Sequence, residues 1–118
     1  MTEPSYNGGC HCGAVRYEVS LDLDKVNVCN CSRCSKLGVI WSFATPDKFK
    51  LVSGGSDLTG YRFNRRAIDH RFCAKCGIES FAQGPAPSGA EMIAINVRCL
   101  DGVDLDALKP DRFNGRDY

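Results

Sequence analysis

The sequence lacks the features that would direct a chain into or across a membrane. No run of apolar residues approaches the ~20 that a membrane-spanning helix needs. The stretch from Met1 to Tyr6 is polar and no apolar segment follows it, so no secretory signal is predicted. We therefore expect a cytoplasmic protein with no membrane partner.

The sequence also lacks a strong excess of charge of either sign. Its formal net charge is +1, and it has no long basic tract. If seven cysteines bound two divalent ions as thiolates, the net charge would fall to about −2, because ligand thiols lose their protons. Such a chain has no field that attracts nucleic acid, so no nucleic-acid partner is expected, and chromatin binding is disfavoured with it.

No low-complexity segment or domain boundary interrupts the chain. Its 118 residues fit one domain covering 1–118, and 43% hydrophobic with 25% charged residues argues against disorder. Valine, tyrosine and other strand-forming residues recur between turn residues, which predicts an all-β fold, either a sandwich or a folded-over sheet. The expected strands are 14–20, 25–30, 39–45, 49–53, 58–63, 67–72, 78–83 and 91–98. We also expect a helical turn over 104–108 capped by Asp104, and an extended tail from Lys109 to Tyr118.

Cysteine is what this chain has in excess, with eight residues in 118. A disulfide scaffold is one explanation, but such scaffolds are typical of secreted proteins. Clustered thiols in a reducing compartment are more often metal ligands or redox groups. The cysteines fall into three clusters, which are Cys10 with Cys12, Cys29 with Cys31 and Cys34, and Cys73 with Cys76.

The number of cysteines in each cluster suggests two metal sites of different kinds. A structural zinc takes four protein ligands, whereas a catalytic zinc takes three and keeps one position open. Cys10, Cys12, Cys73 and Cys76 would make the first site, and Cys29, Cys31 and Cys34 the second. Spacing alone leaves open a different site in which Cys31 and Cys34 join Cys73 and Cys76. Thiolate ligands favour zinc, although iron is also compatible with them.

Several other residues carry two interpretations. His11 lies between two ligands and should point outward as a spectator. His70 could be a ligand or an acid–base group, but a surface histidine on a hairpin is the simpler expectation. Cys99 is expected to be a small buried apolar residue, with a redox nucleophile as the alternative.

The aromatic residues are expected mainly in the core. They are Trp41, Phe43, Phe49, Phe72 and Phe81. Because the segment 39–45 leads directly out of the second cluster, Trp41 or Phe43 could instead line that site.

Four segments together carry a resemblance to a known family. They are GGCHCGAVRYEV (Gly8–Val19), CNCSRCSKLG (Cys29–Gly38), FCAKCGIESF (Phe72–Phe81) and INVRCLDGVDL (Ile95–Leu105). In this order they resemble the glutathione-dependent formaldehyde-activating enzyme (GFA) family, also known through centromere protein V.

The resemblance implies a β-tent fold of antiparallel sheets with zinc sites at the loops. It further implies two zinc ions per chain, a structural ion on Cys10, Cys12, Cys73 and Cys76 and a second ion, facing substrate, on Cys29, Cys31 and Cys34. The implied activity is that of a carbon–sulfur lyase joining glutathione to formaldehyde to give S-hydroxymethylglutathione.

Two functional classes follow, an enzyme acting on a thiol–aldehyde adduct and a non-enzymatic zinc module that binds a protein partner. In the first class, Arg33, Arg65 and Arg66 are candidates to bind substrate carboxylates, although a solvated hairpin face is the simpler explanation of the arginines. Methionine sulfoxide reductases of the B type share the β-tent fold, but this chain lacks their two well-separated C-x-x-C pairs.

Overall fold

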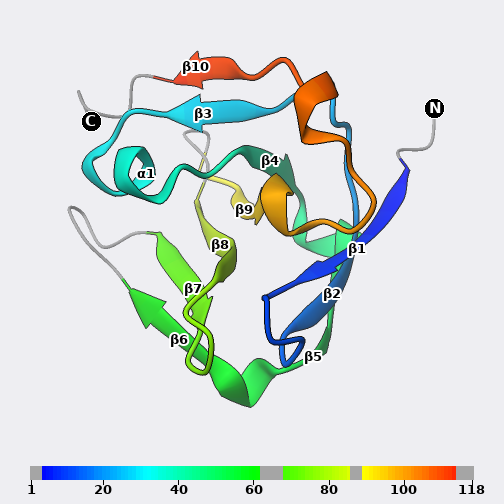
Figure 1. Ribbon diagram of the computed structural model, residues 1–118, viewed down its shortest axis with the longest axis vertical. Coiled ribbons are helices and arrows are strands. Elements are labelled where there is room, and N and C mark those ends of the chain that lie inside the picture. The colour runs from blue at the N-terminus through cyan, green and yellow to red at the C-terminus, as the bar shows by residue number, and fades with distance from the viewer. Residues whose placement is uncertain (1–3, 62–67, 86–88, 114–118) are drawn as a thin grey trace.

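A computed structural model of the protein describes residues 4–61, 68–85 and 89–113, and strands dominate them. Three strands, β1 (Ser5–Gly9), β2 (Arg16–Ser20) and β5 (Phe49–Ser53), form an antiparallel sheet in the order β1-β2-β5. In β2, Tyr17 and Val19 are buried, and the residues on either side of each are exposed or half-buried. This alternation is expected for a strand with one face on the core. Figure 1 shows this sheet set at an angle to the rest of the chain.

The second sheet contains seven strands. In sheet order they are β10 (Asp111–Phe113), β3 (Asn27–Cys29), β4 (Trp41–Ala44), β9 (Glu91–Asn96), β8 (Glu79–Pro85), β7 (Asp69–Cys73) and β6 (Leu58–Tyr61). All neighbours are antiparallel except β10 and β3, which run parallel over three residue pairs. β3 meets β4 through a single pair, Asn27 with Trp41. The predicted all-β fold of antiparallel sheets is confirmed, and the β10–β3 pair is its parallel exception.

The main core lies where side chains of the two sheets meet. Tyr17 of the first sheet has its ring centroid 5.3 Å from Phe49 and 6.0 Å from Phe81, which belongs to the second sheet. The buried Tyr17 hydroxyl donates to the carbonyl oxygen of Ser80 at 3.1 Å, so its polar atom is satisfied. These contacts hold the first sheet against β8, the strand next to β7, which carries Cys73.

A short helix, α1 (Ser32–Leu37), was not anticipated from the sequence. Cys31 caps it, because its Sγ accepts the backbone N–H of Cys34 at 3.3 Å. Gly38 ends it in the left-handed conformation, with φ 72° and its N–H bonded to the Cys34 carbonyl. Both caps of the helix therefore use atoms of the second cysteine cluster, the Cys31 sulfur at the start and the Cys34 carbonyl oxygen at the end.

The remaining sequence predictions have mixed outcomes. The helical turn is present as η4 (Leu105–Ala107), capped by Asp104 as expected. The predicted extended tail appears as β10, and its last residues, 114–118, lie outside the described residues. Phe43 contradicts the core prediction, since it is 46% exposed on β4. Alternation places it on the opposite face from its buried neighbours Ser42 and Ala44.

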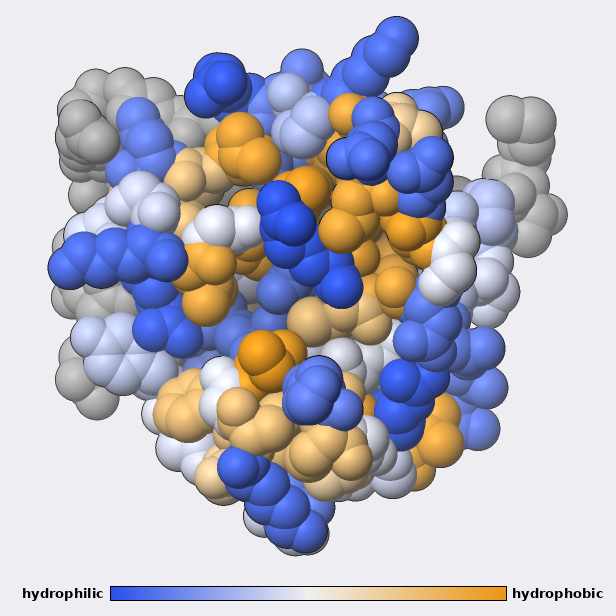
Figure 2. Space-filling view, viewed as in Figure 1, coloured by the Kyte–Doolittle hydropathy of each residue, from blue (hydrophilic) through white to orange (hydrophobic). Residues whose placement is uncertain are grey.

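The surface mixes charged and apolar side chains, which Figure 2 shows interleaved over one face, in keeping with the low net charge. Within the described ranges, every helix is too short or too polar to cross a bilayer.

Candidate metal centres

Four sulfur atoms from distant parts of the chain meet at the first site. Cys10 and Cys12 lie at the turn between β1 and β2, and Cys73 and Cys76 at the turn between β7 and β8. All four Sγ atoms lie within 4.8 Å of one another, with 3.6 Å from Cys10 to Cys12 and 3.7 Å from Cys12 to Cys73. Tetrahedral zinc with bonds of about 2.3 Å to sulfur requires sulfurs roughly 3.8 Å apart. The spacing therefore fits a closed four-sulfur site.

Backbone N–H groups point at these sulfurs. Val15 N donates to Cys10 Sγ at 3.3 Å, and Lys75 N donates to Cys73 Sγ at 3.4 Å. The backbone N–H of Ile78, followed by that of Cys12, lowers the pKa of Cys76 to about 6. Gly77, at φ 80°, lets the chain turn back over the pair. Donors of this kind stabilise thiolates, the form that binds metal.

The second site gathers the three remaining clustered cysteines. The sulfurs of Cys29, Cys31 and Cys34 lie within 4.8 Å of one another. Each accepts at least one N–H: Cys31 N donates to Cys29 Sγ at 3.4 Å, Cys34 N donates to Cys31 Sγ at 3.3 Å, and the indole Nε1 of Trp41 donates to Cys34 Sγ at 3.3 Å. Burial raises the pKa of Cys34, and the Trp41 bond opposes that shift. In the described ranges no histidine, carboxylate or further cysteine joins this group.

The grouping of the sulfurs bears on the alternatives left open by the sequence. All eight cysteines are free thiols in the structure, with no disulfide between them. Cys31 and Cys34 lie with Cys29 and not with Cys73 and Cys76, so the alternative four-sulfur site is not formed. Both groups offer sulfur donors that are already hydrogen-bonded, a donor set that suits zinc.

The comparison with family models covers almost the whole chain. Residues 5–114 match the model described as glutathione-dependent formaldehyde-activating enzyme. The chain belongs to this family. A crystal structure of a Rhodobacter sphaeroides protein is also similar, with 35% identity and a TM-score of 0.82 over 91% of this chain and 99% of that one.

The histidines lie in opposite environments in this GFA-family chain. His11 is exposed, as expected of a spectator. His70 is only 5% exposed, so the expectation of a surface histidine was wrong. His70 lies on β7 in register with Tyr61 of β6 and Ala82 of β8, and it is buried while its neighbours Asp69 and Arg71 are half-buried. Its Nδ1 lies 3.3 Å from Oε2 of Glu79.

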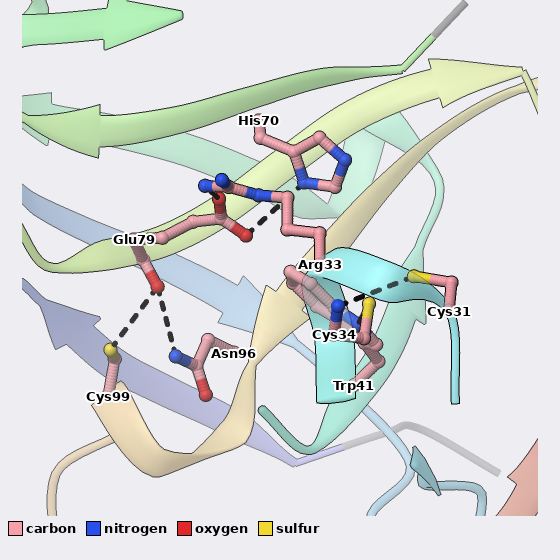
Figure 3. Close-up of polar contacts among 8 residues, drawn as sticks. All are labelled: Cys31, Arg33, Cys34, Trp41, His70, Glu79, Asn96 and Cys99. Carbon is pink, nitrogen blue, oxygen red and sulfur yellow. Dashed lines mark hydrogen bonds and ion pairs between the residues drawn. The ribbon is translucent and has the colours of Figure 1, made fainter. Parts of the chain in front are cut away.

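Glu79 is the residue near the second site that sequence reasoning missed. Its side chain is 1% exposed, and it meets Arg33 and His70 with different carboxylate oxygens (Figure 3). A single glutamate in a polar segment gives no sequence signal of burial. Arg33, its partner, lies 46 positions away.

Of the arginines expected to bind substrate, only Arg33 falls in the described part of the chain. Arg65 and Arg66 lie outside the described residues. Arg33 pairs with Glu79, and its guanidinium carbon lies 4.8 Å from the centroid of the Tyr61 ring. Beside it is a surface pocket of about 340 Å³, lined by Ser32, Arg33, Lys36, Leu37 and Tyr61.

Cys99 is separate from both metal groups. Burial raises its pKa to about 12, and its Sγ faces the Glu79 carbonyl at 3.8 Å. Cys99 is half-buried and not fully buried as expected. A thiol of that pKa is protonated at neutral pH, which disfavours the redox nucleophile.

Proposed function

We propose that this protein is a zinc-dependent carbon–sulfur lyase of the GFA type that acts on a thiol–aldehyde adduct, with glutathione and formaldehyde as the first substrates to test. The observation that carries the proposal is the contrast in ligand number. Four sulfurs meet at the first site, and three meet at the second, where no fourth side-chain ligand joins them among the described residues. Three protein ligands are the hallmark of a metal site that receives a small molecule.

The proposed reaction forms one bond and moves one proton. The thiol sulfur joins the carbonyl carbon of the aldehyde, the π bond opens toward oxygen, and the proton lost by the thiol ends on that oxygen. Cys29, Cys31 and Cys34 would hold the second zinc, and Cys10, Cys12, Cys73 and Cys76 the first. A divalent zinc at the second site would supply Lewis acidity, which lowers the pKa of a thiol or polarises a carbonyl.

The residues around the second site would prepare it for this chemistry. Backbone N–H groups and the Trp41 indole stabilise the three thiolates. Trp41 also packs with Val39 and Ala82 against Cys34, so one side of the site is dry. The pocket beside α1 offers Arg33 and Lys36 as cations for a carboxylate of the thiol substrate.

Diffraction at the zinc absorption edge, on crystals soaked with glutathione, tests the arrangement. We expect two ions, with a non-protein sulfur reaching only the ion on Cys29, Cys31 and Cys34. Exchange spectroscopy by NMR should then show that the protein speeds adduct formation above the rate in buffer. A fourth protein ligand on the second ion, or an unchanged rate, would favour the zinc module that binds a protein partner.

A further inference from the structure

Glu79 holds its buried carboxylate between two different parts of the fold. It is the first residue of β8 and lies three positions after Cys76. Oε1 meets Nη2 of Arg33 from α1, and Oε2 meets Nδ1 of His70 from β7 at 3.3 Å. The Glu79 backbone carbonyl accepts Nδ2 of Asn96 at 2.9 Å. Figure 3 shows the residue held from all of these directions.

A carboxylate buried to this extent is costly unless it is fully paired. An apolar residue of similar size is often at least as favourable for stability at such a position. Stability alone is therefore a weak reason for a buried Arg–Glu–His arrangement. A better reason is that Glu79 must hold one of its partners in a fixed position.

The partner that needs holding is α1. It has six residues, too few for a helix to be stable by itself, so it depends on contacts with its surroundings. Trp41 contacts it through Cys34 Sγ, and Arg98 Nε contacts its C-terminal cap through the Gly38 carbonyl at 3.0 Å. Arg33, which lies between Cys31 and Cys34, supplies the charged contact through Glu79.

We infer that Glu79 is the positioning residue of the second metal site: by fixing Arg33 it fixes α1, and with α1 the sulfurs of Cys31 and Cys34. The inference rests on the part of the proposed function that places a metal on Cys29, Cys31 and Cys34. A four-sulfur site gathers its own ligands around the ion. A three-sulfur site has one bond fewer, so it depends more on a surrounding that holds the ligands in advance.

Trp41 allows metal at the second site to be observed separately from metal at the first. It is the single tryptophan of the chain, and its indole bonds to Cys34 Sγ. Its fluorescence should therefore respond to metal at the second site, while a chromophoric chelator reports zinc released from both sites. Zinc release that leaves the Trp41 fluorescence unchanged is then assigned to the first site.

The experiment compares zinc release from the unaltered protein and from Glu79→Gln, which keeps the shape of the side chain and removes its charge. We expect the second ion to bind about 10–100-fold more weakly in the variant, as is typical when the partner of a metal ligand is lost, and the first ion to bind as before. Asp101→Asn is the matched control. It removes an exposed ion pair with Arg16 and should change neither site.

A second variant keeps the test decisive if Glu79→Gln does not fold. Arg33→Gln breaks the same contact from its more exposed side, where the side chain is 23% exposed. Where both single variants fold, the double variant should lose no more affinity than the worse single one, because both act through one contact. Additive losses, equal weakening of both ions, or an unchanged second site would overturn the inference.

The readout uses neither a thiol nor an aldehyde. A protein that binds the second ion through Glu79 but does not speed adduct formation would refute the proposed function and leave this inference standing. Failure of the unaltered protein to bind a second ion would remove both.

Discussion

The two cysteine groups differ most in how much of the chain each one joins. The first links turns that are 61 residues apart, from Cys12 to Cys73, and so ties the three-stranded sheet to the seven-stranded one. The second lies within six consecutive residues, Cys29 to Cys34, and joins one strand end to one short helix. A cross-link stabilises a fold mainly by closing a long loop. We therefore expect the first group to contribute mainly to stability and the second, as proposed above, to chemistry.

Loss of the first site should produce the largest effect. In Cys73→Ser, or after chelation of both ions, we expect the free energy of unfolding to fall by at least about 4 kcal/mol. This is the loop-closure contribution of a cross-link spanning about 60 residues. Urea denaturation of the metal-loaded protein measures this change. Cys99→Ser is the matched control, because it alters a cysteine outside both groups. Similar losses in the two variants would contradict the structural role.

Loss of the second site should affect activity far more than stability. In Cys31→Ser we expect one ion instead of two and loss of the proposed activity. The free energy of unfolding should fall by less than in Cys73→Ser, because this group closes no long loop and its ion contributes only its own binding free energy. Metal analysis together with urea denaturation distinguishes the outcomes. A loss of stability as large as that of Cys73→Ser would erase the distinction between the two sites.

A smaller effect is expected at the edge of the second site. Trp41→Phe keeps the ring in the apolar cluster and removes the N–H donor to Cys34 Sγ. One hydrogen bond to a charged acceptor contributes about 1.5–3 kcal/mol, so the second ion should bind roughly 10–100-fold more weakly, with the smaller loss favoured if water replaces the donor. Competition with a chelator measures it. An unchanged affinity would mean that the backbone donors are sufficient.

The smallest effect concerns Cys99, which should take no part in either site. Its pKa of about 12 lies above the ordinary value of 9.0 because the thiol is buried. The folded state therefore keeps the proton that the unfolded state loses as the pH rises above 9, so Cys99 should make stability decline between pH 9 and 12. Comparing stability against pH for Cys99→Ala and the unaltered protein tests this. Rapid reaction of Cys99 with a thiol reagent near pH 7 would revive the redox interpretation.

Most of the strands could be predicted because their patterning is local. The segment Phe49–Ser53 matches its predicted bounds, and the other expected strands shift by a few residues within the described part of the chain. Strand β1 was not predicted, because its sequence SYNGG is polar and rich in glycine. Helix α1 was missed because six residues are too few to show helical periodicity, and its cap is a cysteine sulfur in place of the usual oxygen. Its ends are set by the second cluster.

The candidate site was predictable only in its ligands. Cysteine spacing indicates sulfur groups, but it does not indicate that His70 is buried beside Glu79, a residue of the neighbouring strand. Likewise, burial of Glu79 depends on Arg33 arriving from a distant helix. Neither fact is encoded in a local pattern. The sequence therefore predicted the sulfurs and did not predict the buried Arg33–Glu79–His70 contacts beside the second group.

The parallel pairing of β10 with β3 has a practical consequence for anyone preparing this protein. Cys29 ends β3, and that strand has three partners in β10 but one in β4. Strand β10 therefore supports the position of Cys29, a cysteine more than eighty positions earlier in the sequence. Removing Asp111–Phe113 would remove these three pairs, so we expect Cys29 to be held less firmly in such a variant.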